Sequence, residues 1–305
     1  MRKIIYAGLL IILCMGITGC AGIDYKKAVK LQEQGEYDQA LELYNGISDY
    51  KDAKEKGAEC QDMVDVIKAY TDIRKNVEDK NTELDSAVAQ AIELIDKKQT
   101  PLDVSLIQTL GNAISDAKAA KQDIPDKSED IDEMKQIVET LKQIDYTDVL
   151  ENLSQNQINL ERSIKQYELV DHPDEKYVIS CLENIDVIRD IAAVTEENDP
   201  NGHLNKPSGY TAQIYFSCEW VDQSEVSGDT VIDKGTDCGG SIEVYATTEE
   251  AETRRDYLAE FDGGILASGS HTVVGTVLVR TSDYLTASQQ QELEKLIVEQ
   301  LTKVE

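Results

Sequence analysis

The stretch AQIYFSCEW, residues 212–220, decides the fold class of this chain. Its larger apolar side chains, from Ala212 to Trp220, take every second position, which is the period of a half-buried β-strand. Most of the chain before it has helical periodicity instead, and both phenylalanines and the only tryptophan lie after residue 215. We therefore expect an α+β protein, all-α at the N-terminal side with a small α+β domain at the C-terminal side.

The region around this stretch predicts the rest of the C-terminal domain. Further strands are expected at 242–244 and at 272–280, and the second is apolar on both faces and hence central in the sheet. An apolar stripe predicts a helix over 173–191, and capping boxes at 247–250 and 288–291 mark the starts of two more helices. The order helix, strand, strand, helix, strand, helix indicates a mainly antiparallel sheet covered by helices.

Residues 62–170 have the heptad spacing of packed helices, with Tyr70, Val77 and Leu84 seven residues apart. Asn81 interrupts the apolar seam, as polar residues that set the register of helices do. The pattern predicts an antiparallel helical bundle or coiled-coil stalk. Its seam either closes within one chain or supports self-association.

Before this region, the pattern Gly35-x-Tyr37-x2-Ala40-x3-Tyr44 resembles the central part of a tetratricopeptide repeat. The resemblance covers one unit, whereas a peptide-binding superhelix needs about three. It implies a capping helical hairpin rather than a repeat-type peptide receptor.

The N-terminus has a basic start at 1–3 and an apolar run at 4–17, which the tetrapeptide ITGC (17–20) closes. These are the features of a secretory signal peptide, and the run is shorter than the about 20 residues that a membrane-spanning helix needs. The tetrapeptide resembles the lipobox of bacterial lipoproteins, in which the cysteine thiol is diacylated and cleavage leaves that cysteine first. The resemblance implies a lipid, such as palmitate, on Cys20 and a place on the extracellular face of the cell membrane. Plain secretion is the alternative.

The charge balance limits the partners. The chain has 30 Lys and Arg against 59 Asp and Glu, a net charge of −29, which argues against binding to nucleic acid. An anionic protein is also repelled by an anionic bilayer, so attachment depends on the lipid. We expect three kinds of partner: the membrane through the anchor, an envelope protein, or a wall component.

The expected organisation has four parts: a signal peptide at 1–19, the lipidated cysteine and tetratricopeptide-like hairpin at 20–61, the helical stalk at 62–170, and the α+β domain at 171–305. The last part resembles an uncharacterised domain of secreted and lipid-anchored proteins of Gram-positive bacteria. The matching stretches are VTEENDPNG (194–202), GSIEV (240–244) with Glu250-Ala251 and Arg255-x-Tyr257, and GTVLVR (275–280). That resemblance supports the expected location outside the cytoplasm and the domain boundary at residue 171, and it implies no activity or ligand.

The loop 198–210 is the candidate binding site, because it is long and joins a helix to the first strand. It is either a ligand-binding loop or a connector ordered by turns. Its candidate ligand-binding residues are Asn198, Asp199, Asn201, His203, Lys206 and Tyr210.

No metal or other cofactor is expected, with one alternative. Glu197, Asp199, Asn201 and Gly202 follow the first half of a calcium-loop pattern. Ser208 stands where a bidentate Glu should close the cage, so the match fails there and the segment is interpreted as an ordinary turn. The three histidines are isolated and no paired-cysteine motif exists, which argues against zinc.

Cys218 and Cys238 lie at inward positions expected on neighbouring strands. In an oxidising compartment they form a disulfide, and in an anaerobic host they stay as two buried thiols.

No catalytic residue is expected. Ser270 and His271 are adjacent, but neighbouring side chains of an extended chain point apart. The chain is therefore interpreted as a noncatalytic binding or scaffold module of the envelope. The alternative is an envelope hydrolase with its site in the C-terminal domain.

Overall fold

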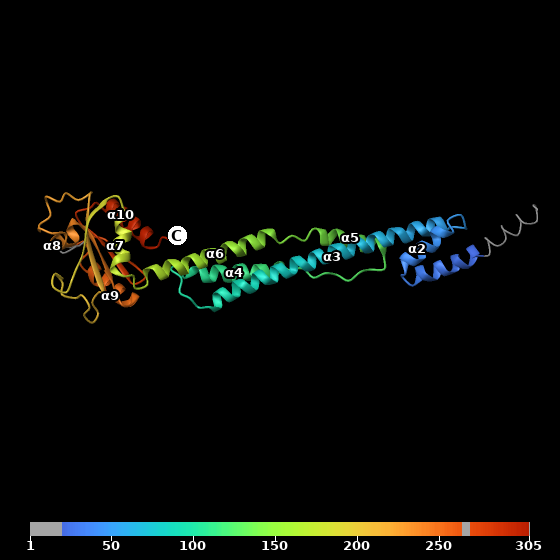
Figure 1. The fold of residues 1–305 in the computed structure, drawn as a ribbon, viewed down its shortest axis with the longest axis horizontal. Coiled ribbons are helices and arrows are strands. Elements are labelled where there is room, and N and C mark those ends of the chain that lie inside the picture. Colours follow the sequence, from blue (N-terminus) through green and yellow to red (C-terminus); the bar gives the residue numbers. More distant parts are fainter. Residues whose placement is uncertain (1–19, 264–268, 305) are drawn as a thin grey trace, which may run out of the picture. The chain divides into compact units, whose positions relative to one another are not determined.

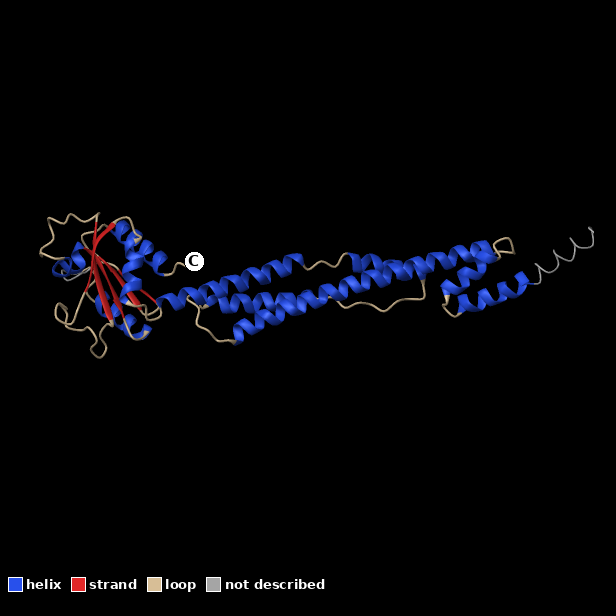
Figure 2. Cartoon of the chain, in the orientation of Figure 1, coloured by secondary structure: helices blue, strands red, loops and turns tan. Residues whose placement is uncertain are grey.

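The computed structural model describes residues 20–263 and 269–304, so the expected signal peptide at 1–19 lies outside the described residues. By its contacts the chain divides into two units. The first unit holds residues 1–90 and 114–153, and the second unit holds 91–113 and 154–305. Together they form the expected α+β class, with helices throughout and a five-stranded antiparallel sheet in the second unit (Figure 2).

The first unit is helical among its described residues. It contains a helical segment at 20–33 and helices α2 (Tyr37–Gly46) and α5 (Ile131–Lys142). Three longer helices have residues in both units: α3 (Ala53–Asp96), α4 (Ser105–Ala120) and α6 (Thr147–Val170) (Figure 1). Within the described segments, no helix is both long and apolar enough to cross a membrane.

The hairpin at the start of the first unit packs around small residues. Ala28, Ala40 and Ala53 are fully buried together with the Tyr44 ring and the Cys60 thiol. The small alanines allow close approach of neighbouring helices, and the tyrosine fills the remaining space. Burial raises the pKa of Tyr44 to about 12.

Asn81 lies on α3, and both the oxygen and the nitrogen of its side-chain amide make hydrogen bonds. Its side chain accepts a hydrogen bond from the Tyr146 hydroxyl at 2.8 Å and donates one to the Gln122 carbonyl at 3.1 Å. The same hydroxyl accepts from the Gln122 backbone N–H at 2.9 Å. These contacts join three separate segments, so they pin the position of α3 along its neighbours.

The sheet of the second unit has the strand order β1-β2-β3-β5-β4, and every neighbouring pair is antiparallel. The strands are β1 (Ile188–Ala193), β2 (Ala212–Cys218), β3 (Gly239–Val244), β4 (His271–Val274) and β5 (Val277–Thr281). A short helix α8 (Val231–Lys234) and a 3-10 turn η1 (Gly235–Cys238) lead into β3.

Helices cover both faces of this sheet. On one face, α7 (Glu175–Glu183) and α10 (Ala287–Leu301) pack over the main core, which includes Phe216, Ile242 and Val279. On the other face lies α9 (Thr248–Ala259), against β4 and β5. This second face is less apolar, because Gln213, Tyr215, Glu243 and Arg280 alternate with the core-facing residues of their strands. A polar site can therefore form on this second face, because polar and charged side chains lie there.

The expectation of one central strand over 272–280 is wrong. The segment is a hairpin of β4 and β5 that turns at Gly275, whose φ is 58°. β5 is internal, but β4 lies at the edge of the sheet. An apolar run does not by itself distinguish one long strand from two short ones, and the left-handed conformation that glycine permits made the turn available.

The helix expected over 173–191 ends at Glu183, and β1 follows. Ile185, Ile188 and Ile191 continue the helical stripe in sequence. In the structure, the pairing of β1 with β2 has an irregularity between Ile188 and Ile191, which brings both onto the core side despite their odd spacing.

The helix caps agree in part with the sequence. Thr247 caps α9 and accepts from the Glu250 N–H, so half of the expected capping box forms; among the described contacts the Glu250 side chain does not return the hydrogen bond. The capping box of α10 uses Thr286 and Gln289 instead of the expected pair at 288 and 291, so the helix begins two residues earlier.

Candidate functional site

A pocket of about 400 Å³ opens between the loop at 203–210 and helix α9 in the second unit. This volume falls in the range of pockets that hold small ligands, roughly 300–1,000 Å³. The residues that line it are His203, Ser208, Gly209, Tyr210, Tyr245, Glu250, Thr253, Arg254 and Tyr257.

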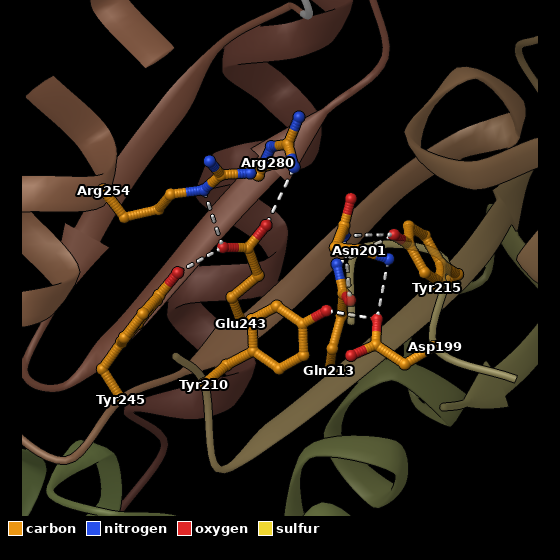
Figure 3. A network of polar contacts seen from close by, with 9 residues as sticks. All are labelled: Asp199, Asn201, Tyr210, Gln213, Tyr215, Glu243, Tyr245, Arg254 and Arg280. Carbon is orange, nitrogen blue, oxygen red and sulfur yellow. Dashed lines mark hydrogen bonds and ion pairs between the residues drawn. The ribbon is translucent and has the colours of Figure 1, made fainter. Parts of the chain in front are cut away.

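Beside the pocket, the Glu243 carboxylate of β3 is completely buried and faces two guanidinium groups (Figure 3). It accepts hydrogen bonds from Arg280 Nη1 at 2.8 Å and from Arg254 Nε at 3.3 Å. The Tyr245 hydroxyl donates a third at 2.6 Å. Burial, and then the nearby Glu243, raise the pKa of Tyr245, so this hydroxyl stays protonated and keeps donating.

Arg254 connects this network to the pocket. Its Nε is held by Glu243, and its guanidinium carbon lies 5.4 Å from the centroid of the half-exposed Tyr257 ring. Its two terminal amino groups make no hydrogen bond to any residue that the structure describes. One end of the guanidinium is thus fixed while the other is open to a ligand.

Glu250 stands one helical turn before Arg254 on α9. Residues four apart on a helix ordinarily pair when their charges are opposite. Here Arg254 pairs with Glu243 instead, and the Glu250 Oε2 atom is buried without a hydrogen-bond partner. Glu250 and Arg254 both line the pocket, so its lining contains a carboxylate as well as a guanidinium.

Unpartnered polar atoms concentrate on this face of the sheet. Over the described ranges, five buried side-chain atoms have no hydrogen-bond partner: Ser241 Oγ, Glu250 Oε2, His271 Nδ1, Arg280 Nε and Glu294 Oε1. Ser241 pairs directly with Arg280 and Arg280 with His271, so three of these residues form one row across β3, β5 and β4. Buried polar groups are nearly always bonded, so such a concentration marks a face that sacrifices stability.

Asp199 organises the loop that forms the other wall of the pocket. Its carboxylate accepts from the Tyr210 hydroxyl at 2.5 Å and from the backbone N–H groups of Leu204 and Asn201 at 2.8 and 2.9 Å. Burial alone would raise the pKa of Asp199, but these hydrogen bonds outweigh it and lower the pKa. The Tyr210 ring, 2% exposed, is thereby held at the pocket wall.

The structure brings part of the expected loop site together. His203 and Tyr210 line the pocket, and Asp199 lies behind Tyr210. Asn201 turns toward the sheet, with its amide 3.4 Å from both Gln213 Oε1 and the Tyr215 hydroxyl.

The two remaining loop candidates lie outside the pocket lining. Asn198 accepts from the Thr195 N–H at 2.6 Å and orders a turn. The Lys206 residue is exposed.

Asp199, the central residue of the calcium-like segment, uses its oxygens within the protein. Both carboxylate oxygens of Asp199 accept from protein donors. No group of three or more His, Cys, Asp or Glu residues able to hold a metal ion occurs within the described segments.

The sequence pattern did not predict the α9 side of the pocket or the buried network. A signal for them exists: Glu243 and Arg280 are charged residues inside the otherwise apolar strands of GSIEV and VLVR. Charges at such positions are costly unless they are paired. Neither strand by itself shows which residue is the partner.

Cys218 and Cys238 are free thiols in the structure, which corresponds to the second of the two alternatives. Both are buried in the main core, and Cys238 Sγ lies 3.4 Å from the Phe216 carbonyl oxygen. Burial raises the pKa of Cys238 to about 11, so its thiolate is scarce at neutral pH. Cys20, the expected lipid attachment site, is exposed.

Comparisons with known proteins give no relative. No protein-family model matches the chain, and neither a curated protein nor a solved structure matches it.

Proposed function

We propose that this protein is a membrane-anchored lipoprotein of the extracytoplasmic face and a noncatalytic binding module of the cell envelope. Its binding site is the pocket between the loop at 203–210 and α9. The observation that carries the proposal is the open end of Arg254 in a pocket of ligand size. The buried Glu243 carboxylate between two guanidiniums adds little net stability, but it orients the partly exposed Arg254.

The anchor in this proposal is a lipid on Cys20. Its thiol is exposed at the start of the helical segment at 20–33, and a chain with a net charge of −29 is repelled by an anionic bilayer, so attachment depends on the lipid. Replacing Cys20→Ser in the native host should move the protein from the membrane fraction to the medium or leave it as unprocessed precursor. Unchanged membrane retention of the variant would contradict the anchor.

The binding role is tested with the mature chain 20–305 carrying Cys20→Ser. The protein is incubated with the small-molecule fraction of a digested envelope from the native host, and retained compounds are identified by mass spectrometry. Compounds retained by this protein should be lost with Arg254→Ala and kept with Arg255→Ala on the same helix. Equal retention by all three proteins, or none by any, would contradict the proposal.

The alternative, an envelope hydrolase, has one supporting observation. His271 Nε2 lies 3.6 Å from Asp262 Oδ2, an arrangement that can orient a general base. In the same incubation, accumulation of cleaved products that depends on His271 would favour the hydrolase. The proposed binding role includes no cofactor, and the segment at 197–202 acts in it as a loop-ordering turn.

A further inference from the structure

We infer that the pocket takes an amphoteric amino compound, an amino acid or short peptide with a free ammonium and a free carboxylate. The ammonium binds Glu250 and the carboxylate binds Arg254. This inference rests on the proposed function, because it names the ligand class of the same pocket.

The Arg254 end is suited to a carboxylate. A guanidinium whose two terminal amino groups are free presents the planar fork that carboxylates bind with two parallel hydrogen bonds. Glu243 takes only the Nε atom of Arg254, and the Tyr257 ring lies close to the guanidinium. The group is held in place before any ligand arrives, which reduces the cost of ordering it.

The Glu250 end requires a donor. A buried carboxylate oxygen without a partner is destabilising, since it has lost its water and gained no hydrogen bond. An ammonium group supplies three donors and the opposite charge. Binding would therefore repair a defect that the unliganded pocket carries.

The two ends together exclude simpler ligands. The side chains of residues four apart on a helix start about 5–6 Å from each other, so both charges act on one small molecule. A simple anion on Arg254 would face the Glu250 carboxylate, and a simple cation on Glu250 would face the Arg254 guanidinium. A ligand with both charges satisfies each partner.

The remaining lining consists of four aromatic residues, His203, Tyr210, Tyr245 and Tyr257, together with Ser208, Gly209 and Thr253. Tyr210 and Tyr245 pack edge to face with ring centroids 6.5 Å apart, and His203 packs on Tyr210 in the same way. The hydroxyls of both tyrosines are engaged by Asp199 and Glu243. Tyr210 and Tyr245 are each 2% exposed and back the pocket wall, whereas the half-exposed Tyr257 ring offers apolar surface, which favours a ligand with an apolar or aromatic side chain.

The test is calorimetric titration of the mature Cys20→Ser chain with four probes: phenylalanine, the dipeptide Phe-Ala, its N-acetyl form and its C-terminal amide. The better of the two unblocked probes should bind at least about tenfold more tightly than either blocked form, since each block removes one charged hydrogen-bonding partner. Phenylalanine and Phe-Ala distinguish a free amino acid from a peptide as the source.

Glu250→Gln assigns the ammonium end, with Glu249→Gln, an exposed neighbour, as the control. The Glu250 variant should bind unblocked Phe-Ala about as weakly as the N-acetyl form, while the Glu249 variant should bind it like the parent. Glu250 is not part of the buried network of Glu243, so loss of binding with an unchanged circular dichroism spectrum reports on the pocket.

Several outcomes overturn the inference. If blocked and unblocked probes bind equally, or if Glu250→Gln changes nothing, the ligand class is wrong. If no probe binds while envelope compounds are still retained in an Arg254-dependent way, the ligand class fails and the proposed function stands. Absence of both kinds of binding overturns both.

Discussion

Glu243 shows how a single residue can matter for the stability of the second unit and for its site. Its carboxylate has no contact with solvent and accepts from three side chains on β5, α9 and the residue after its own strand. Removing one partner of a buried ion pair leaves the other charge uncompensated. The energetic effect of this residue is therefore large, although the pair itself adds little net stability.

Glu243→Ala should lower the free energy of unfolding of the second unit by about 3–5 kcal/mol, because Arg280 would remain buried without its carboxylate. Urea unfolding followed by the fluorescence of Trp220, the only tryptophan, reports on this unit. Arg255→Ala on the surface of α9 is the control and should cost less than about 1 kcal/mol. Similar decreases in the free energy of unfolding in the two variants would show that Glu243 is not important for the stability of the second unit.

The cysteines allow a second residue-scale prediction. In the mature Cys20→Ser chain, Cys60, Cys181, Cys218 and Cys238 are buried, so a thiol reagent should label none of them rapidly in the native protein. After denaturation without reductant, all four should react. Reaction of only two would reveal a disulfide between Cys218 and Cys238.

The Asp199 carboxylate predicts a pH dependence. Its pKa is lowered in the folded protein, so its contribution is fully present above the ordinary Asp pKa of about 4 and is lost as the pH falls through the lower folded value. Asp199→Asn should cost about 1–2 kcal/mol at neutral pH, and the gap to the parent should narrow below about pH 4. Urea unfolding at a series of pH values measures the gap. A gap independent of pH would mean that the charge of Asp199 does not matter.

At the scale of elements, α10 has two neighbouring candidates for its N-cap, Thr286 and Ser288. Thr286 and Gln289 exchange hydrogen bonds with each other's backbone N–H groups, whereas Ser288 is exposed within the helix. A helix start depends on which side chain reaches the first free N–H groups. Both hydroxyl residues fit the local pattern, and only the structure selects one.

Thr286→Ala should therefore destabilise the second unit by about 1 kcal/mol, the usual effect of removing an N-cap. Ser288→Ala should change stability little. Unfolding monitored by Trp220 fluorescence compares the two. If Ser288→Ala proved the more damaging change, α10 would begin at the later position.

At the scale of the whole molecule, several apolar seam residues of the long helices are buried in the single chain. Val77, Leu84, Ala91 and Leu160 are at most 1% exposed in the isolated chain. Helices that bury their seam within one chain have little apolar surface left to drive association.

We therefore expect the mature Cys20→Ser chain to sediment with the mass of a single chain across a range of concentrations. Sedimentation equilibrium measures this directly. A mass that rises to two chains with concentration would support the other alternative, self-association through the stalk.

The local pattern of the sequence was sufficient for much of this protein. The alternation at 212–220 predicted β2, and the loop at 198–210, the candidate binding site, supplies His203, Ser208, Gly209 and Tyr210 to the pocket lining. The strand could be predicted because periodicity is a property of neighbouring residues.

The tertiary structure alone decided the rest. It made β1 from residues with helical spacing, and it split one apolar run into β4 and β5. It also placed Arg280 against Glu243, 37 residues away. Arg254 pairs with the same carboxylate and not with Glu250, its neighbour one turn earlier on the helix. Strand register and the partners of buried charges depend on residues distant in sequence, and the energy that selects them exists only once those residues are packed together.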